Sequence, residues 1–395
     1  MRITIANRIS TVVGGAEEYL IRLLPELRAS GLELSFFFEH MGRGSPIAPP
    51  DATSWFGDRP ENAGALKSIV EWKPDVIYCN GLNESVTEAD LSRIAPSVYS
   101  AHAYVGTCIS GRKMHAFPSA TVCEKRFGRA CLVHYLPRRC GGLNPVSMLT
   151  RFRAETSRLA AIRRFSAVVV HSEHMLTEYR HHGIEATVVP LPVVAAKALA
   201  RPLPKAGGER RLVFLGRLMD VKGPEILIDA AARAAASLAE LKLTIAGEGE
   251  ERAALERRAQ AVSPAATNLS IRFVGRVDGA SRDALLANAD ALVVPSVWPE
   301  PFGMVGLEAA AFGVPTVAFN VGGIHEWLSH GFSGCLAEPP DSDALAKAIV
   351  DCVGAPEKLA QLRDGARAVH AEFSRRSTVD ALRKIFERIT TATIA

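Results

Sequence analysis

The chain alternates short apolar runs with longer stretches in which apolar residues recur every three or four positions. Most of the short runs are apolar at every position, which is typical of parallel strands buried on both faces. Alternating strands and helices predict an α/β fold built from doubly wound parallel sheets. The expected strands are Ile3–Ala6, Leu34–Phe38, Val76–Cys79, Val98–Ala101, Val168–His171, Leu212–Leu215, Leu243–Ala246, Ile271–Val274, Leu292–Val294 and Thr316–Phe319. The expected helices include Ala16–Arg28, Glu225–Ala236, Leu345–Val353 and Thr378–Ile389.

The length of 395 residues predicts two domains, because a single ordinary core does not grow that large. The proline-rich segment Val189–Pro192 predicts the break between them. We expect a Rossmann-like domain over residues 1–190 and a second one over 191–377. The last helix, in residues 378–395, is expected to return to the first domain. Ligands of such sheets bind beyond the carboxyl ends of the strands, so the site is expected in a cleft between the domains.

The composition is that of a globular protein, with 48% hydrophobic and 22% charged residues. No apolar run is long enough for a signal peptide or a spanning helix, which predicts a cytoplasmic protein. Charge is concentrated in residues 112–164, which contain twelve Lys or Arg but only two Glu. Such a segment suits an anionic membrane surface, a phosphorylated lipid or an acidic glycan, or is an ordinary solvated face. Nucleic acid is not expected, because no reader motif or stacking platform accompanies the charge.

Two carboxylates, Glu300 and Glu308, flank the most informative stretch of the chain. A predicted strand precedes it, a Pro-Phe-Gly turn lies inside it, and an Ala-rich helix is expected from Leu307 to Phe312. Glu300 is then in the loop, and Glu308 is expected in the first turn of the helix. A helix start offers free N–H groups and a positive dipole end to anions. Both acids are therefore predicted to bind a sugar or a nucleotide.

Glycines follow several of the predicted strands. Gly14 and Gly15 open the first helix, where they either let a bound group approach the backbone or simply make a turn. Gly216 ends a strand of the second domain, and Arg217 and Lys222 project from the loop that follows it. Two cations beside a helix start predict a diphosphate clamp, the alternative being two solvated surface cations.

The next glycine-ended strands in the second domain lead to Gly247-Glu248-Gly249 and to Gly275-Arg276-Val277. Glycines at successive strand ends predict a lined crevice, and the backbone near Val277 is placed to edge a nucleobase.

Four of the seven cysteines fall in a basic, loop-rich insertion at about residues 103–150. Four thiolates in one segment suit a structural zinc ion. However, the C-x2-C pairs of common zinc modules are absent, so free thiols or other pairing are the alternative. The four residues are Cys108, Cys123, Cys131 and Cys140.

Taken in order, these segments resemble a retaining glycosyltransferase of family 4, the two-Rossmann GT-B type. The likeness covers nearly the whole chain and is densest in the second domain. It implies that the domain over residues 1–190 binds the acceptor and that the domain over 191–377 binds the nucleotide-sugar donor. It rests on Gly14-Gly15, Gly216-Arg217, Lys222-Gly223, Gly247-Glu248-Gly249, Pro295-Ser296, Glu300 to Glu308, and Gly322-Gly323 before Glu326.

The resemblance implies transfer of a hexosyl group from a nucleoside-diphosphate sugar to a glycan or lipid-linked acceptor in polysaccharide biosynthesis. It also implies that catalysis needs no metal or other cofactor. Glu300 would face the donor sugar, Glu308 the ribose, and Arg217 and Lys222 the diphosphate. His102, after a strand of the first domain, matches the histidine that touches the sugar. The remaining donor contacts implied are Gly15, Gly216, Val277, Phe302, Gly303, Met304 and Val305.

Since Glu308 is assigned to the ribose, no second acid is left for a double displacement, which favours attack on the face from which the diphosphate leaves. The alternatives are a catalytically silent scaffold that binds a nucleotide sugar, or a sugar-nucleotide epimerase on the same fold. His102 could instead be a buried structural histidine.

Overall fold

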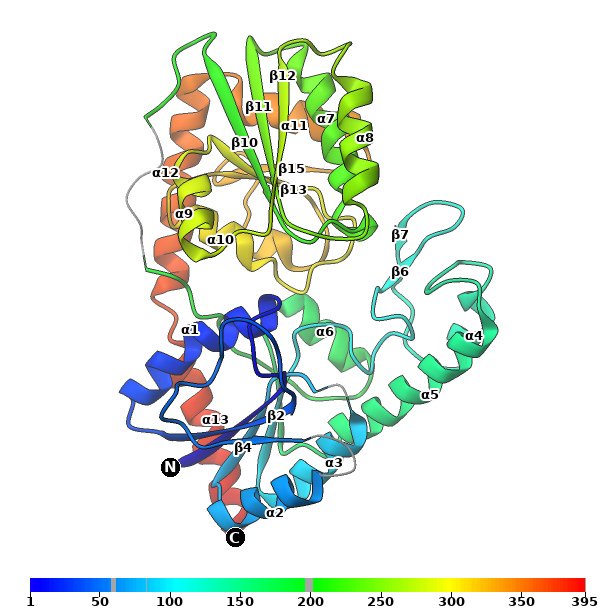
Figure 1. Ribbon diagram of the computed structural model, residues 1–395, viewed down its shortest axis with the longest axis vertical. Helices are drawn as coiled ribbons and strands as arrows, with labels where there is room; N and C mark the ends of the chain where they lie inside the picture. Colours follow the sequence, from blue (N-terminus) through cyan, green and yellow to red (C-terminus); the bar gives the residue numbers. More distant parts are fainter. Residues whose placement is uncertain (58–61, 83, 196–201, 395) are drawn as a thin grey trace. The chain divides into compact units, whose positions relative to one another are not determined.

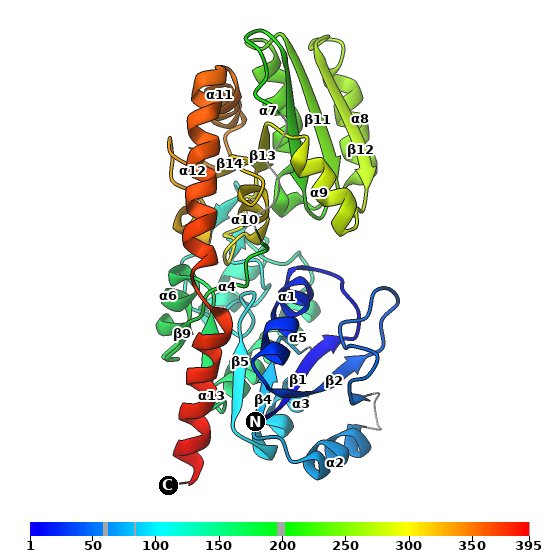
Figure 2. The same ribbon diagram turned by 90° about the vertical axis from the view of Figure 1, so that its left-hand side faces the viewer.

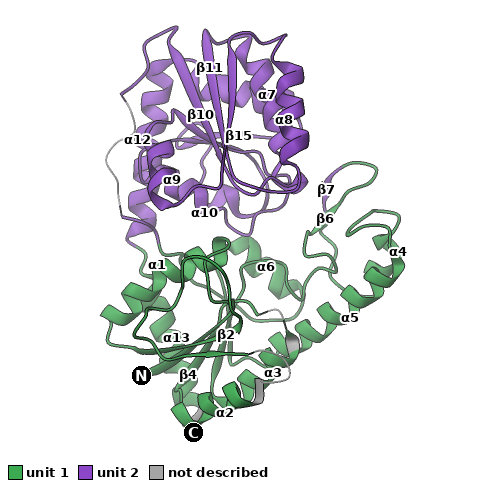
Figure 3. Ribbon diagram, in the orientation of Figure 1, with its two compact units in different colours: residues 1–119, 123–192, 376–395 green, residues 120–122, 193–375 purple. Residues whose placement is uncertain are grey.

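The computed structural model describes residues 1–57, 62–82, 84–195 and 202–394, which form two compact units (Figures 1 and 3). Unit 1 contains residues 1–119, 123–192 and 376–395, and unit 2 contains residues 120–122 and 193–375. In the described residues, no helix is both long and apolar enough to cross a membrane.

Among the described residues, unit 1 contains a seven-stranded parallel sheet in the order β3-β2-β1-β4-β5-β8-β9. Its strands are β1 (Arg2–Ile9), β2 (Glu33–His40), β3 (Ser54–Phe56), β4 (Val76–Cys79), β5 (Ser97–Ser100), β8 (Ala167–Val170) and β9 (Thr187–Val188). Its helices are α1 (Gly15–Ala29), α2 (Asn62–Trp72), α3 (Ser85–Ile94), α4 (Ala130–Tyr135), α5 (Pro145–Ile162), α6 (Glu173–His181) and α13 (Thr378–Ile394).

In the part of the chain that the structure describes, unit 2 has a six-stranded parallel sheet in the order β12-β11-β10-β13-β14-β15. Its strands are β10 (Glu209–Leu215), β11 (Glu240–Ala246), β12 (Leu269–Gly275), β13 (Ala291–Val294), β14 (Thr316–Phe319) and β15 (Gly334–Ala337). Its helices are α7 (Pro224–Ala235), α8 (Arg252–Val262), α9 (Gly279–Ala287), α10 (Met304–Ala310), α11 (Ser342–Val353) and α12 (Pro356–Ser374), with short 3-10 turns at Asp220–Lys222 and Gly322–Glu326.

The predicted fold class, with two doubly wound parallel sheets, is confirmed. Each of the ten predicted strands coincides with a strand of the structure. In both sheets the strand order runs outward from the first strand and then reverses on its other side, as in Rossmann folds. The reversal lies between β1 and β4 in unit 1 and between β10 and β13 in unit 2. Loops that follow such a strand pair diverge and leave a crevice at the carboxyl edge of the sheet.

The helix after β13 begins earlier than expected. Gly303 is its N-cap with φ of 88°, in the left-handed region that favours glycine, and α10 therefore starts at Met304 rather than at Leu307. As a result, Glu308 lies in the second turn of α10, and the prediction that it lies in the first turn is wrong. The short strands β3, β9 and β15 were also not predicted; β3 and β9 have three and two residues, too few for a pattern.

Helix α13 follows α12 in the sequence (Figure 2), but α13 belongs to unit 1 and α12 to unit 2 (Figure 3). It packs against α1, and the Phe386 ring meets Tyr78 of β4 edge-on with 6.1 Å between ring centroids. Both rings are buried. The end of the chain thus completes the core that its first strands begin.

Candidate functional site

Two loops of unit 2 are fastened together where its strand order reverses. The loop between β10 and α7 presents the carbonyl oxygen of Val221, which accepts hydrogen bonds from the N–H groups of Val297 (3.0 Å) and Trp298 (3.1 Å) after β13. Gly223 has φ of 65°, and a Cβ at that position would lie 2.0 Å from the carbonyl oxygen of Pro295. Only glycine fits there, so the two loops form one rigid edge.

This edge places a lysine against a carboxylate. Nζ of Lys222 lies 2.6 Å from Oε1 of Glu300, and 4.6 Å from the centroid of the Trp298 ring. The Lys222 side chain is 20% exposed and that of Glu300 is 8% exposed, so the ion pair is mostly shielded from water. The cation is held by a charge on one side and an aromatic face on another.

The backbone of Glu300 is held as tightly as its side chain. Its carbonyl oxygen accepts a hydrogen bond from the N–H of Gly323 at 2.7 Å. A Cβ on Gly322, where φ is 58°, would lie 2.2 Å from that carbonyl oxygen and 2.5 Å from the Glu300 nitrogen. The glycine pair before Glu326 therefore fits the turn that carries Glu300.

Phe302 and Trp327 fix the rest of this turn. The Trp327 indole N–H donates a 2.6 Å hydrogen bond to the carbonyl oxygen of Phe302, and a Cβ on Gly306 would lie 1.9 Å from the indole ring. The buried Phe302 ring packs on Phe373 with 5.8 Å between centroids. Since that side chain points into unit 2, the backbone of Phe302 is the part that a donor could meet.

The second carboxylate has a different cation. Oε2 of Glu308, a buried residue of α10, lies 3.5 Å from Nη1 of Arg282 on α9. Helix α9 begins after Val277, which is half-buried, and its N-cap Asp278 accepts a 2.7 Å hydrogen bond from the N–H of Ser281. The two acids of the Glu300–Glu308 stretch thus belong to separate ion pairs.

Arg217 and the glycines at the strand ends complete this edge of unit 2. Arg217 is exposed in the loop after β10. A Cβ on Gly247 would lie 1.8 Å from the carbonyl oxygen of Gly216, so the loops after β10 and β11 touch backbone to backbone. The N–H of Gly247 continues the contact with a 2.8 Å hydrogen bond to Gly275. The predicted crevice residues are therefore neighbours at one edge of the sheet.

His102 and Gly15, by contrast, belong to unit 1, where His102 follows β5. Its Nε2 lies 2.7 Å from Oδ1 of Asn80 and 3.1 Å from the hydroxyl oxygen of Ser100. The amide of Asn80 donates to Oδ1 of Asn7 and to the carbonyl oxygen of Ala16, each at 3.0 Å. The oxygen of Asn80 is therefore left as the acceptor for His102.

The direction of these bonds assigns the His102 tautomer. Nδ1 of His171 lies 3.0 Å from the carbonyl oxygen of Val189, which can only accept, so Nδ1 carries the proton. Nε2 of His171 then accepts from Ser100, 3.2 Å away, and Ser100 accepts from His102. His102 carries its proton on Nε2, and its Nδ1 is an acceptor.

Both histidines are neutral near pH 7. Burial, and next the neighbouring His171, hold the pKa of His102 well below its ordinary value. Burial lowers the pKa of His171 from 6.5 to about 4. Their rings stack 4.8 Å apart, and each also lies 4.8 Å from the ring of Tyr19. A neutral imidazole in this position is suited to accepting a hydrogen bond rather than to carrying charge.

The glycine pair of unit 1 has unequal roles. Gly14 is the N-cap of α1, and its N–H donates to Oε2 of Glu17 at 2.8 Å, so it serves the helix. Gly15 is exposed, and a Cβ there would meet no described atom within 4 Å. Packing among the described residues therefore does not require glycine at position 15.

The four clustered cysteines all line one small cavity of unit 1, of about 20 Å³. In the described residues, the structure shows no disulfide and no group of three or more His, Cys, Asp or Glu side chains already arranged to hold a metal ion. Burial raises the pKa of Cys123 and Cys131, and it raises that of Cys140 to about 11. These thiols are poor nucleophiles near pH 7.

Several residues of both sites were not predicted. Trp298 and Arg282 contact the predicted cation and acid of unit 2, and Asn80, Ser100 and His171 surround His102. Asn80 directly follows β4 and His171 directly follows β8, both buried strands, and His102 lies two residues after the end of β5. That shared position was a signal that could have identified them.

Comparison with known proteins gives matches concentrated in the second half of the chain. Residues 184–369 match the family model described as Glycosyl transferases group 1. A D-inositol 3-phosphate glycosyltransferase of Thermobispora bispora is 32% identical over 238 residues, which are 56% of this chain and 55% of that protein. A glycogen synthase of Mycobacterium tuberculosis is 37% identical over 197 residues, 48% of this chain and 45% of that protein. The chain thus spans about half the length of the curated relatives it matches.

Solved structures match over the whole chain. Anabaena Alr3699/HepE in complex with UDP and glucose aligns with a TM-score of 0.69 at 21% identity, over 99% of this chain and 100% of that one. Sucrose-phosphate synthase from Thermosynechococcus elongatus aligns with a TM-score of 0.71 at 19% identity, over 99% of each chain. At these identities the likeness shows the fold. The chain has the two-Rossmann-like GT-B fold, and the match over residues 184–369 supports a place among the group 1 glycosyltransferases.

Proposed function

We propose that the protein is a retaining glycosyltransferase of family 4, which moves a hexosyl group from a nucleoside-diphosphate sugar to a glycan or lipid-linked acceptor. The observation that carries the proposal is the Lys222–Glu300 pair at the strand reversal of unit 2. Crevices at such reversals are where α/β sheets bind ligands. A cation and an acid are held there with Arg217 on the same loop as Lys222.

The leaving group sets the demand for cations. As the glycosidic bond breaks, negative charge grows on the diphosphate, and fixed positive groups that need no reorganisation stabilise it. Lys222 and Arg217 supply that charge from this chain, together with the backbone N–H groups of Gly303, Met304 and Val305, which follow Glu300 in the sequence. We therefore propose transfer without a catalytic metal.

The two acids take different parts of the donor. Glu300 would exchange its bond to Lys222 for bonds to the sugar hydroxyls, and Glu308 would accept from the ribose hydroxyls. Gly216 and Val277 would border the nucleotide. His102, a neutral acceptor at Nδ1, would bind a sugar hydroxyl, with Gly15 at the approach. With Glu308 occupied, no second carboxylate is left for a double displacement, so we propose same-face attack and retention.

The acceptor side draws support from the surface of unit 1. Val133 and Val146 are 71% and 70% exposed on α4 and α5, and Leu143 between these helices is 63% exposed. They lie in the segment rich in arginine. Apolar side chains among cations suit an anionic lipid interface, so we propose a lipid-linked acceptor at the cytoplasmic face of a membrane. Sedimentation with anionic vesicles, lost at high salt and in a Val133→Ser, Val146→Ser double variant, would support this assignment.

The reaction is tested by following free nucleoside diphosphate from a panel of nucleotide sugars, each with and without candidate acceptors. Transfer predicts release that depends on acceptor, and the product linkage by NMR should retain the anomeric configuration of the donor. A silent scaffold would bind a donor without turnover. An epimerase would change the sugar without acceptor and without net release of the nucleotide. Either of those outcomes would overturn the proposal.

A further inference from the structure

The cysteine cavity of unit 1 is assembled from four separate pieces of chain. Cys108 lies in the turn after β5, Cys123 directly follows the short strand Thr121–Val122, Cys131 lies in α4, and Cys140 lies in the turn after α4. All four line the same cavity, whose volume of about 20 Å³ is near that of one water-sized sphere. Residues spread over this much sequence meet at one point only if the fold brings them there.

We propose that Cys108, Cys123, Cys131 and Cys140 bind one zinc ion that ties the insertion of unit 1 together. This inference is independent of the glycosyl transfer proposed above, because none of the residues assigned to the donor lines the cavity.

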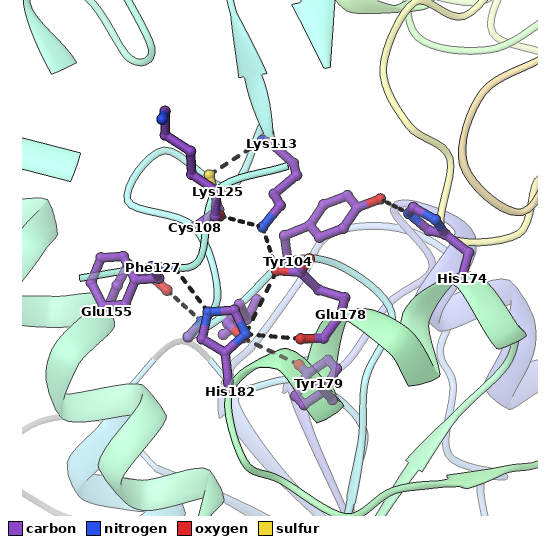
Figure 4. Close-up of polar contacts among 12 residues, drawn as sticks. Tyr104, Cys108, Lys113, Lys125, Phe127, Glu155, His174, Glu178, Tyr179 and His182 are labelled. Carbon is purple, nitrogen blue, oxygen red and sulfur yellow. Dashed lines mark hydrogen bonds and ion pairs between the residues drawn. The ribbon is translucent and has the colours of Figure 1, made fainter. Parts of the chain in front are cut away.

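The chemistry of the cavity wall selects the ion. Besides the four thiols, the wall presents the imidazoles of His115 and His134, but it presents no Asp or Glu. Magnesium and calcium prefer carboxylate and carbonyl oxygens, whereas four sulfurs in a closed site suit tetrahedral zinc. Lys113 also reaches the wall, but its ammonium is engaged by Glu178 at 2.6 Å and by the carbonyl oxygen of Lys125 at 2.9 Å (Figure 4).

The surroundings already supply partners for sulfur. The backbone N–H of Lys113 donates to Sγ of Cys108 at 3.2 Å, and Lys113 adopts φ of 51° to do so. Nδ1 of His115 lies 3.4 Å from Sγ of Cys140. Such outer contacts orient metal ligands. A four-thiolate zinc centre carries two net negative charges, which suits a segment with the cationic excess of residues 112–164.

The insertion of unit 1 contains little regular secondary structure that could order it. Between β5 and α5 the chain forms only two short strands and the short helix α4. Two contacts hold the insertion to α6 and the residue that follows it. Lys113 pairs with Glu178 of α6, and His182, the C-cap of that helix, accepts a 2.9 Å hydrogen bond from the N–H of Phe127 (Figure 4). Helix α4 and the turn that contains Cys140 follow these contacts in the sequence. An ion that links all four segments would order them with one set of bonds.

The described side chains are not yet at ligating positions. Neutral thiols have little attraction that would draw them together, whereas a divalent cation draws in thiolates. Binding forms four Zn–S bonds, and the four thiol protons pass to solvent. Because the four thiols line one cavity, side-chain rotations within it would bring the sulfurs toward the ion with no change of topology.

The test is elemental analysis of the full chain, purified without chelator and with thiols protected from air. We expect about one zinc ion per chain. Titration of four thiols with a mercurial reagent should release this zinc in proportion, and a chromophoric chelator detects the released ion. Cobalt exchanged into the protein should give the intense visible bands and the sulfur-to-cobalt charge transfer of a tetrahedral thiolate site. Iron in place of zinc, disulfides among the four cysteines, or metal-free folded protein would overturn the proposal.

Variants separate the site from folding. Cys131→Ser should lose stoichiometric zinc, and the matched control Cys79→Ala, at a buried cysteine of β4 outside the cavity, should keep it. If Cys131→Ser does not fold, the cobalt spectrum of the unaltered chain decides the question. Zinc retained at full stoichiometry by Cys108→Ser, Cys123→Ser, Cys131→Ser and Cys140→Ser alike would exclude this ligand set.

Discussion

Nζ of Lys222 lies 2.6 Å from Oε1 of Glu300, so two groups that the proposed reaction assigns to different parts of the donor form an ion pair with each other. A donor would separate them, with the phosphates taking the ammonium and the sugar taking the carboxylate. The ion pair therefore keeps both side chains in place for the donor without leaving a charge unpaired in a shielded position.

Removing either partner should affect rate more than fold. Lys222→Ala and Glu300→Gln are each expected to lower kcat/KM by about 10²–10³-fold, the usual loss for one preorganised group at a developing charge. Lys222→Ala should also lower the free energy of unfolding by about 1–3 kcal/mol, less than for a fully buried pair because Lys222 is 20% exposed. The control variant Arg258→Ala breaks an exposed ion pair with Asp229. It should change neither kcat/KM nor the free energy of unfolding by more than surface substitutions usually do. Near-normal turnover by Glu300→Gln would contradict the assignment.

Glu308 should recognise the ribose. Deleting the ribose hydroxyls from a nucleoside diphosphate is expected to weaken its binding to the unaltered protein by about 10–100-fold, as hydrogen bonds to a charged group are lost. In Glu308→Ala the same deletion should make little difference. Calorimetry with the ribo and dideoxy forms measures both effects in one thermodynamic cycle. Equal sensitivity of the two proteins to the deletion would remove Glu308 from the ribose site.

His171 should make unit 1 sensitive to acid. The pKa of His171 is about 4 in the folded chain, whereas an ordinary histidine, as in the unfolded chain, has a pKa of 6.5. The unfolded chain therefore binds the proton more readily. The stability that depends on neutral His171 is fully present above pH 6.5 and is lost as the pH falls toward 4, by about 3 kcal/mol over that range. His102, whose pKa is also lowered, acts in the same direction.

Denaturant unfolding at a series of pH values tests this dependence. As the pH is lowered, the denaturant concentration at the midpoint of unfolding of unit 1 should fall more steeply in the unaltered protein than in His171→Gln. The exposed control variant His181→Gln should behave like the unaltered protein. Identical pH profiles for all three proteins would show that His171 is not buried as a neutral base.

Gly322 should matter for Glu300 rather than for stability alone. Gly322→Ala places a Cβ 2.2 Å from the carbonyl oxygen of Glu300, at φ of 58°. The matched control Gly331→Ala has φ of 78° but meets no described atom within 4 Å. Gly331→Ala should lose about 1–2 kcal/mol of stability from the strained backbone alone. Gly322→Ala should lose more than this control, because its Cβ also overlaps backbone atoms of Glu300. Only Gly322→Ala should also lower kcat, by about tenfold or more, because small displacements of positioned groups are costly. Equal kcat in the two variants would contradict the role of this contact.

The fold was predictable because buried parallel strands leave continuous apolar runs, as in Ala291–Val294. The edge of the unit 2 sheet at which we propose the donor binds was partly predictable, because Gly216, Gly247 and Gly275 lie at the ends of successive strands. Trp298 and Arg282 could not be assigned, since their partners Lys222 and Glu308 are distant in sequence and meet only through the sheet. The His102 tautomer was also beyond reach, because it depends on a chain of bonds that ends at Val189. The start of α10 was misjudged because the φ of Gly303 cannot be read from its identity.

The position of α13 has a consequence for biosynthesis. Phe386 fills the core beside Tyr78, and the helix that carries it follows residues 193–375 of unit 2 in the sequence. Domains that are continuous in sequence can fold while the ribosome is still at work. Here the amino-terminal sheet waits, with part of its core open, until the whole of unit 2 has emerged. Unit 1 is therefore completed only after unit 2, although most of unit 1 is translated before it.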